Sequence, residues 1–486
     1  MDDSPGIVSY VAGLAAPSAD DDLVGELQQL RLRIDQLESD ARKSKAAKDS
    51  AKPPPEFPSV KITGFTQFDT AFYSQSPENL ATVGDAQDGS GFRRARLAVN
   101  GKVAEFTNYQ LELDFATAGR PSFFDTFVEQ GNIPTLGAVK IGQYCQPFCA
   151  DSFAGFRNLT FLERSLPFLA MVPFRRIGAQ FSDLSEDEMT AWAGSLYRSG
   201  GFNNAPLGDD RFATDFGDLG GYAFSGRLTH LLHYDELAGD RYLWHVGGGY
   251  NFSVLGANDA IGSGTNGNAG TPEPFYQART TPEFGPLGYS ELGGSFGNAV
   301  NGTPIFVDTG RYAANHFHLM GVETVYQSGP WGLTNEYMAT VVDSAVGPIF
   351  YHGAYAQVAY RLTGEHRVYD KKTGALGRLV PFTDFIPLKN DGVVGWGAWE
   401  VAGRLSFVDL KNPDKLDGHY YDSATNTFTG TSKAGNGLLT DTTFGVTWFL
   451  NPHAKVQFNW IHAMLDNTAK GFSQADLFVS RVQVDF

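Results

Sequence analysis

The sequence predicts an all-β protein, a large transmembrane antiparallel β-barrel that follows a short helix. Segments throughout residues 59–486 alternate apolar and polar side chains with a period of two, as β-strands do. Glycine and phenylalanine are abundant, with 56 and 38 residues, and charged residues make up only 19% of the chain. Some turns are short, such as QSGPWG and LNPHAK, whereas residues 256–311 and 411–437 form long polar connections. Short turns at one end and long loops at the other are typical of membrane barrels.

The first residues, 1–20, do not fit a strand pattern. The stretch GIVSYVAGLAAPSA resembles the apolar end of a signal peptide, but the basic residues that usually precede such a stretch are absent. Two interpretations stay open here, a signal-peptide remnant and a disordered acidic tail.

Residues 21–45 predict the one clear helix. Apolar residues step by four and three along it and form an a/d seam about two heptads long: Leu23, Leu27, Leu30, Ile34 and Leu37. A coiled coil this short needs partner helices, so the pattern indicates an oligomer. The alternative is an amphipathic helix that packs on its own domain. Residues 46–58 are basic and rich in Ala and Pro, which predicts a linker.

The last ten residues, LFVSRVQVDF, show the strand pattern most clearly. Phe478, Val482, Val484 and Phe486 fall on one face, whereas Arg481, Gln483 and Asp485 fall on the other. The same division recurs in FRRARLAVNGKV, YQLELDFA, GWGAWEVAGRLSFVDL, TTFGVTWFLNP and KVQFNWIHA. A closed barrel explains an apolar face toward lipid and a charged face toward a water-filled lumen, and it has no sheet edges.

Composition also excludes other classes. A net charge of −17 argues against nucleic acid as a partner, because nucleic acid needs a basic surface. The sequence contains no run of 18 apolar residues, so it predicts no transmembrane helix. Carboxylate pairs lie in loop-like sequence without a nucleophile or phosphate-loop motif, so we expect no enzyme and no cofactor.

Residues 146–176 break the alternation and mix charged with apolar side chains. A loop this long is usually functional, and inside a barrel it would narrow the channel. Its charged residues are therefore the main candidates for the constriction: Arg157, Glu163, Arg164, Arg175 and Arg176. A basic stripe on an earlier strand, Arg94, Arg96 and Lys102, either attracts anions in the lumen or pairs with Glu112 and Asp114 across the ladder.

Two further residue pairs have open interpretations. Cys145 and Cys149 form either a local disulfide or two thiols, since no zinc-binding spacing surrounds them. His316 and His318 share a strand face, but nothing nearby completes a metal site, so ordinary wall histidines are the preferred interpretation. We expect no metal.

Several blocks resemble the phosphate-selective porin O and P family, in the expected order from about residue 58 to 486. They are FRRARLAVNGKV, NLTFLERSLP, RRIGAQFSD, GEHRVYDKKTGALGRLVP, GWGAWEVAGRLSFVDL, LTDTTFGVTWFLNPHAKVQFNWIHA and RVQVDF. The resemblance implies about 16 strands, an outer-membrane location in a diderm bacterium and a homotrimer surrounded by lipid. It also implies that residues 146–176 fold inward and that Phe486 is part of the assembly signal.

The expected function is that of a porin, which lets small hydrophilic solutes and ions diffuse passively. The arginines and the resemblance favour anions, including phosphate, whereas the excess of 54 acidic over 37 basic residues keeps cation selectivity open. The N-terminal helix would lie in the periplasm. The alternative function is a structural barrel that tethers the envelope to the cell wall through this helix.

Overall fold

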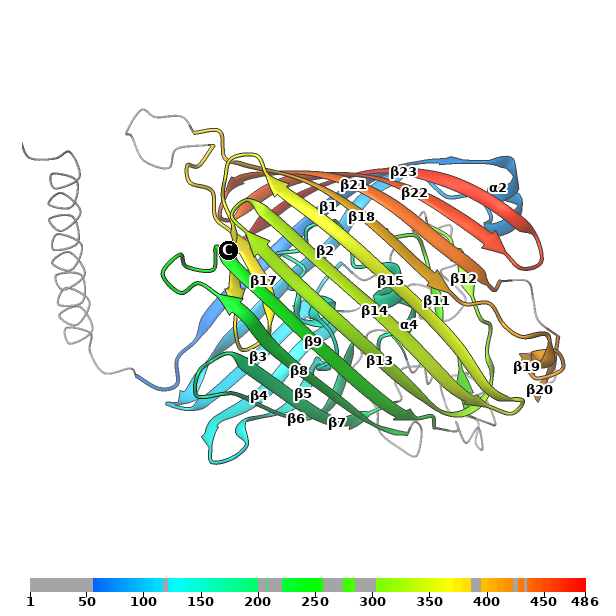
Figure 1. The fold of residues 1–486 in the computed structure, drawn as a ribbon, viewed down its shortest axis with the longest axis horizontal. Helices are drawn as coiled ribbons and strands as arrows, with labels where there is room; N and C mark the ends of the chain where they lie inside the picture. The colour runs from blue at the N-terminus through cyan, green and yellow to red at the C-terminus, as the bar shows by residue number, and fades with distance from the viewer. Residues whose placement is uncertain are drawn as a thin grey trace, which may run out of the picture. The chain divides into compact units, whose positions relative to one another are not determined.

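The fold is described from a computed structural model, for residues 56–116, 121–199, 207, 221–256, 274–284, 303–385, 395–422, 427–431 and 435–486. Sixteen long antiparallel strands form a closed ring in this part of the chain (Figure 1). In chain order these strands are β1 (Lys61–Gln75), β2 (Gly89–Ala104), β3 (Thr107–Asp114), β4 (Ser122–Ile133), β5 (Gly137–Cys145), β6 (Arg175–Leu184), β7 (Thr190–Arg198), β8 (Tyr222–Tyr234), β9 (Tyr242–Val254), β13 (Tyr312–Ser328), β14 (Trp331–Ser344), β15 (Gly347–Arg361), β18 (Ala398–Asp409), β21 (Gly437–Asn451), β22 (Ala454–Asn467) and β23 (Gly471–Asp485).

The first and last strands close the ring. β1 pairs with β2 on one side and with β23 on the other, and its register with β23 runs from Phe65↔Asp485 to Gln75↔Ala475. The predicted faces of the last ten residues are confirmed: Phe478 and Val482 are exposed on the outside, whereas Arg481 and Gln483 are buried inside. The predicted closed antiparallel barrel is therefore confirmed, with sixteen strands in the ring.

The two ends of the barrel differ. At one end, tight connections join β2 to β3, β13 to β14 and β21 to β22, and the chain terminus lies there as well (Figure 1). We call this the short-turn end. It also carries the hairpin of β16 (Arg367–Asp370) and β17 (Ala375–Leu379). The opposite, long-loop end carries α2 (Pro77–Val83), η3 (Asp414–Leu416), β19 (Tyr420–Asp422) and β20 (Thr427–Gly430).

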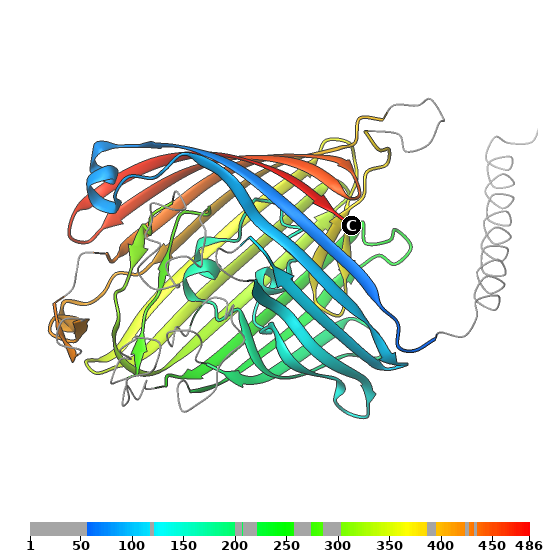
Figure 2. The ribbon, with the colours of Figure 1, turned by 180° about the vertical axis from the view of Figure 1, so that it is seen from behind.

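Chain segments fold into the lumen (Figure 2). The inward segment, residues 146–174 between β5 and β6, carries α3 (Ala150–Phe153) and α4 (Leu166–Met171). It ends two residues earlier than the sequence predicted, because β6 already begins at Arg175. Beside it lie β10 (Phe275–Tyr276), β11 (Arg279–Thr280) and β12 (Val307–Asp308).

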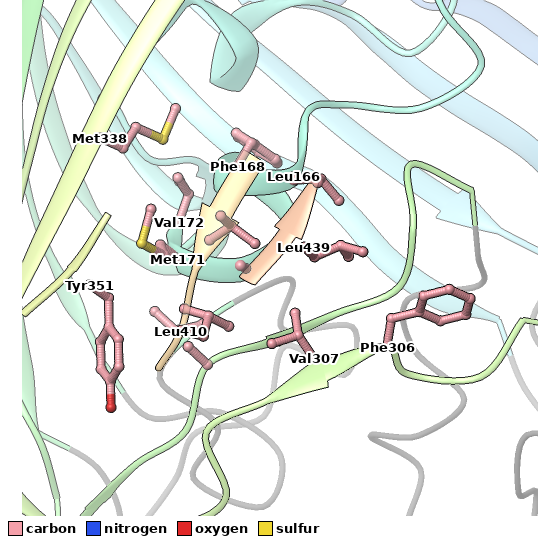
Figure 3. Close-up of a cluster of buried hydrophobic side chains, with 14 of the residues drawn as sticks. Leu166, Phe168, Met171, Val172, Phe306, Val307, Met338, Tyr351, Leu410 and Leu439 are labelled. Carbon is pink, nitrogen blue, oxygen red and sulfur yellow. The ribbon is translucent and has the colours of Figure 1, made fainter. Parts of the chain in front are cut away.

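Apolar side chains from these segments pack against one wall of the barrel (Figure 3). Leu166, Phe168 and Met171 of α4 are buried together with Met338 of β14 and Tyr351 of β15. The strand pattern predicted charged faces toward a water-filled lumen, but part of the lumen-facing surface between β13 and β23 is apolar and buried. Apolar lumen-facing residues there, such as Leu465 and Leu477, are buried in the same apolar cluster as residues of α4 and β12.

Glycines let the inward segment approach the wall. A Cβ on Gly249 of β9 would lie 1.9 Å from the Phe148 carbonyl oxygen, and one on Gly353 of β15 would lie 2.9 Å from the Pro167 side chain. Both distances are too short for any side chain, so the backbone packs directly on the strands at these positions.

The chain divides into two compact units, residues 1–59 and 60–486. The predicted tail 1–20, helix 21–45 and most of the linker 46–58 lie outside the described residues. Among the described helices, none combines the length and apolarity that a membrane crossing demands.

Candidate constriction site

Glu163 of the inward segment lies at the centre of a buried ion network. Its carboxylate accepts hydrogen bonds from Arg93 Nε at 2.9 Å, Arg94 Nη2 at 2.7 Å and Arg481 Nη2 at 3.1 Å. Arg481 also forms two bonds of 2.7 Å with Asp69. The network therefore ties the inward segment to β2, β1 and β23, which are adjacent strands of the barrel wall.

The pKa of the Glu163 carboxyl reflects this setting. Burial alone would raise this pKa, but the guanidinium groups of Arg93, Arg94 and Arg481 outweigh burial and hold it well below the ordinary value of 4.5. Glu163 is therefore a fixed negative charge at neutral pH.

The ring of Phe156 lies among four guanidinium groups. The distances from the guanidinium carbons to the ring centroid are 3.9 Å for Arg94, 4.0 Å for Arg164, 4.6 Å for Arg96 and 5.5 Å for Arg175. An aromatic face attracts cations, so Phe156 helps to keep like charges close together. Phe156 comes from the inward segment, whereas Arg94, Arg96 and Arg175 come from β2 and β6.

Carboxylates on the wall balance part of this charge. Arg96 Nε lies 2.9 Å from Asp114 Oδ2, and Arg96 Nη1 lies 3.7 Å from Glu112 Oε1. Arg175 Nε lies 3.0 Å from Asp125 Oδ1. We define the arginine cluster as Arg93, Arg94, Arg96, Arg157, Arg164, Arg175 and Arg481. Five of its seven guanidinium groups form ion pairs with five carboxylates, so the cluster has a local positive excess although the whole chain is acidic.

The other predicted constriction residues are placed as follows. Arg164 donates to the carbonyl oxygens of Asp151 and Ala154 within the inward segment, and Arg157 lies over the ring of Phe65 at 5.4 Å. Arg176 is buried on β6 and donates to the Arg175 carbonyl oxygen at 3.4 Å. Lys102 does not join the cluster: it is near the short-turn end and donates to the Glu105 carbonyl oxygen.

The remaining predicted residues lie elsewhere. Neither Cys145 nor Cys149 is in a disulfide, and their sulfur atoms lie near Asp125 and Ser152 respectively. His316 and His318 share the outer face of β13, with ring centroids 5.4 Å apart. The described residues contain no group of three or more potential metal ligands.

The terminal residue closes its strand onto β1. The backbone N–H of Phe486 donates to the Gly64 carbonyl oxygen at 3.0 Å, and the N–H of Gly64 donates in return to the Phe486 carbonyl oxygen.

Sequence reasoning missed several partners in the lumen. Arg93 and Arg481 were not singled out, although both contact Glu163. The strand period alone places Arg481 in the lumen, but no local pattern reveals that its partner lies 318 residues away. Further buried pairs in the lumen are Arg227 with Glu323, Arg404 with Glu283, and Arg361 and Arg367 with Glu400.

Comparison with known proteins agrees with this architecture. A sequence model of the family described as phosphate-selective porin O and P matches residues 60–234 and 298–486. The chain is also similar to Porin O of Pseudomonas aeruginosa, with 25% identity over 457 residues, which cover 91% of this chain and 92% of that protein.

Solved structures with a similar fold include an anion-selective porin from Comamonas acidovorans, with 11% identity, a TM-score of 0.49 and coverage of 88% of this chain and 99% of that one. Another is the trimer form of OmpT from Vibrio cholerae, with 10% identity, a TM-score of 0.46 and the same coverage.

Proposed function

Because this chain belongs to the phosphate-selective porin O and P family and is an outer-membrane porin, we propose that it conducts small anions, including phosphate, in preference to cations. The observation that carries the proposal is the arginine cluster. Four of its guanidinium groups surround the ring of Phe156, at the place where the inward segment meets β1, β2 and β6. The positive excess of the cluster attracts an anion and repels a cation.

The geometry accounts for both size exclusion and charge preference. The inward segment and the apolar core beside α4 occupy part of the lumen, so solutes pass through the space that remains. Polar residues of the lumen include the arginine cluster and the pair Lys140–Glu129, and the side chains of this pair remain partly exposed. Charged side chains at such a restricted passage set which ions enter.

A titration of channel conductance with phosphate tests the proposal. In planar bilayers with chloride as the current carrier, phosphate is expected to bind at the cluster and to reduce the current in a saturable way. Arg94→Gln removes one of the guanidinium groups on Phe156 and is expected to weaken this block about tenfold, the effect of one charge-assisted hydrogen bond. A linear, unsaturable response in both proteins would contradict the proposal.

We also propose that the porin is a homotrimer, that its short-turn end faces the periplasm, and that the helix predicted for residues 21–45 is periplasmic. Support for subunit contact comes from hydroxyl groups on the outer surface. Thr70 Oγ1 lies 2.9 Å from Ser90 Oγ, and Ser480 is paired with Thr70 across the next strand. Such hydroxyls suit a protein neighbour better than hydrocarbon. Thr70→Cys is expected to form cross-linked species in native membranes, and only monomers would contradict the assignment.

A further inference from the structure

A second segment of the chain, between β9 and β13, lies in the lumen beside α4. We call residues 274–284 and 303–309 the second inward segment; they contain β10, β11 and β12. Residues 274–284 fall outside the ranges that match the family model, so membership of the family does not predict their contacts. Phe306 and Val307 belong to the same apolar cluster as Leu439 of β21 (Figure 3). Apolar packing therefore holds part of this segment against the inside of the barrel.

Glu283 attaches the second inward segment to two strands of the wall. Its backbone N–H donates to Asp441 Oδ2 of β21 at 2.8 Å, and its Oε2 accepts from Arg404 Nε of β18 at 2.8 Å. The hydroxyl group of Thr443, also on β21, donates to the same Oε2 at 2.8 Å. Glu283 and Asp441 are both 0% exposed, so the contact is shielded from water.

The charges at this contact do not balance when both carboxyl groups are ionised. Among the described residues, the only ion pair of the two is that of Glu283 with Arg404. Glu283 Oε1 and Asp441 Oδ1 are buried and have no hydrogen-bond partner in the described part of the chain. Burial raises the pKa of the Glu283 carboxyl above its ordinary value of 4.5, and Arg404 offsets this effect only in part. Two neighbouring carboxyl groups that cannot both ionise share one proton, as in the aspartic proteases.

The groups packed around this contact supply no second positive charge. The helix α4, which packs on β11, has no titratable residue. Ser406 of β18 contributes a hydroxyl group, and Glu163 contributes its carbonyl oxygen, which accepts from Arg404 at 3.1 Å. Within the second inward segment, Arg279 of β11 is paired in register with Asp308 of β12. Among the described residues, a proton is therefore the simplest source of the missing charge, and it also supplies a donor for the oxygens that lack one.

We propose that Glu283 and Asp441 share one proton at neutral pH and that this proton keeps the second inward segment attached in the lumen. When hydroxide removes the proton, two buried carboxylates face one guanidinium group, and their repulsion favours release of Glu283 into water. Above pH 4.5 the released carboxyl is ionised, so the attached form binds more protons than the released form. Attachment therefore weakens as pH rises, and the passage widens at alkaline pH.

Single-channel conductance in planar bilayers between pH 7 and 9.5 tests the proposal. Buried carboxyl groups in proteins can retain a proton up to about pH 8–9. The conductance of the natural channel is expected to rise in this range, because the ratio of released to attached segment increases by up to about tenfold per pH unit. Asp441→Asn keeps the size of the side chain and can donate its amide to Glu283 without a titrating proton. Its conductance is expected to stay at the neutral-pH value.

Asp466→Asn is the matched control, because it makes the same change in a half-exposed carboxylate that pairs with Lys411. It is expected to keep the alkaline rise. Glu283→Gln is the second variant: one carboxylate remains beside Arg404, no proton is shared, and the alkaline rise is expected to be absent. Constant conductance of the natural channel from pH 7 to 9.5 would overturn the proposal, and so would an equal rise in Asp441→Asn.

Hydrogen exchange of peptides from residues 274–284, corrected for the pH dependence of the chemical exchange rate, measures attachment directly. Protection is expected to be lost at pH 9.5 in the natural protein and kept in Asp441→Asn. Protection that persists at pH 9.5 in the natural protein would contradict the proposal. Reversal potentials recorded in the same bilayers test the proposed anion preference separately, because the shared proton controls the width of the passage and not the sign of its selectivity.

Discussion

The carboxylate of Glu163 lies 2.7 Å from Nη2 of Arg94, and this ion pair joins the inward segment to strand β2. Both side chains are buried. The contact therefore has two effects: it fixes the position of the inward segment, and it cancels part of the positive charge of the arginine cluster.

Replacing Glu163 with glutamine separates these effects. Glu163→Gln keeps the size of the side chain but removes a negative charge from the arginine cluster. At a distance of about 8 Å and an effective dielectric constant of about 20, removing one unit charge changes the electrostatic energy of a passing ion by about 2 kcal/mol. The ratio of anion to cation permeability is therefore expected to rise about five- to thirty-fold, measured from reversal potentials in a salt gradient.

The matched control for this variant is Glu129→Gln, which removes a partly exposed carboxylate from the pair with Lys140. Its effect is expected to be at most about twofold because water screens that pair. Equal shifts in the two variants would mean that Glu163 has no special position in the channel.

The pH dependence of the channel follows from the same residue. The pKa of Glu163 is depressed in the folded protein, so its stabilising effect is fully present above its ordinary value of 4.5 and is lost only as pH falls through the lower folded value. Selectivity and conductance are therefore expected to stay constant from pH 7 to 4.5 and to change well below 4.5. Glu163→Gln should lack this acid transition. A transition of the natural channel between pH 5 and 6 would contradict the assignment.

A substitution at Gly249 tests how closely the inward segment packs against β9. Gly249→Val places a branched side chain where the Phe148 backbone now lies, so the segment must move away from β9. Conductance is expected to increase and single-channel records to become noisier. Gly403→Val is the control, because a Cβ on Gly403 meets only ordinary contacts with Phe444 on the outer face. Unchanged conductance in Gly249→Val would show that the segment tolerates displacement.

The pair of Arg481 and Asp69 tests the contribution of buried charge to stability. Arg481→Gln leaves Asp69 buried without its partner and is expected to lower the free energy of unfolding by about 3–5 kcal/mol. The double variant with Asp69→Asn is expected to lose less, because no uncompensated charge remains. Urea unfolding in detergent measures both, and a double variant less stable than Arg481→Gln would refute this explanation.

The strand pattern was sufficient to predict the barrel, since the period of two alone places Arg481 and Gln483 inside and Val482 and Val484 outside. The number of strands was predicted from the resemblance to the phosphate-selective porin O and P family. The pattern could not reveal that Leu465 and Leu477 are buried in an apolar cluster, because the sequence of a strand is the same whether water or another segment covers its inner face.

The inward segment was predictable from the sequence, but its contacts were not. The break in alternation identified residues 146–176, and the charges in that stretch identified Glu163 and Arg164. The partners Arg93, Asp69 and Arg481 come from distant strands, and only the register of the closed ring brings them together. One local signal was available: the run of glycines in GGGYN marks a strand that another backbone approaches.

The most direct test of the central claim is the reversal potential of the purified channel in planar bilayers under a tenfold gradient of potassium chloride. If the positive excess of the arginine cluster governs the passage, the reversal potential has the sign of chloride selectivity, and Arg94→Gln moves it toward zero. A potential with the sign of potassium selectivity, unchanged in Arg94→Gln, would contradict the claim.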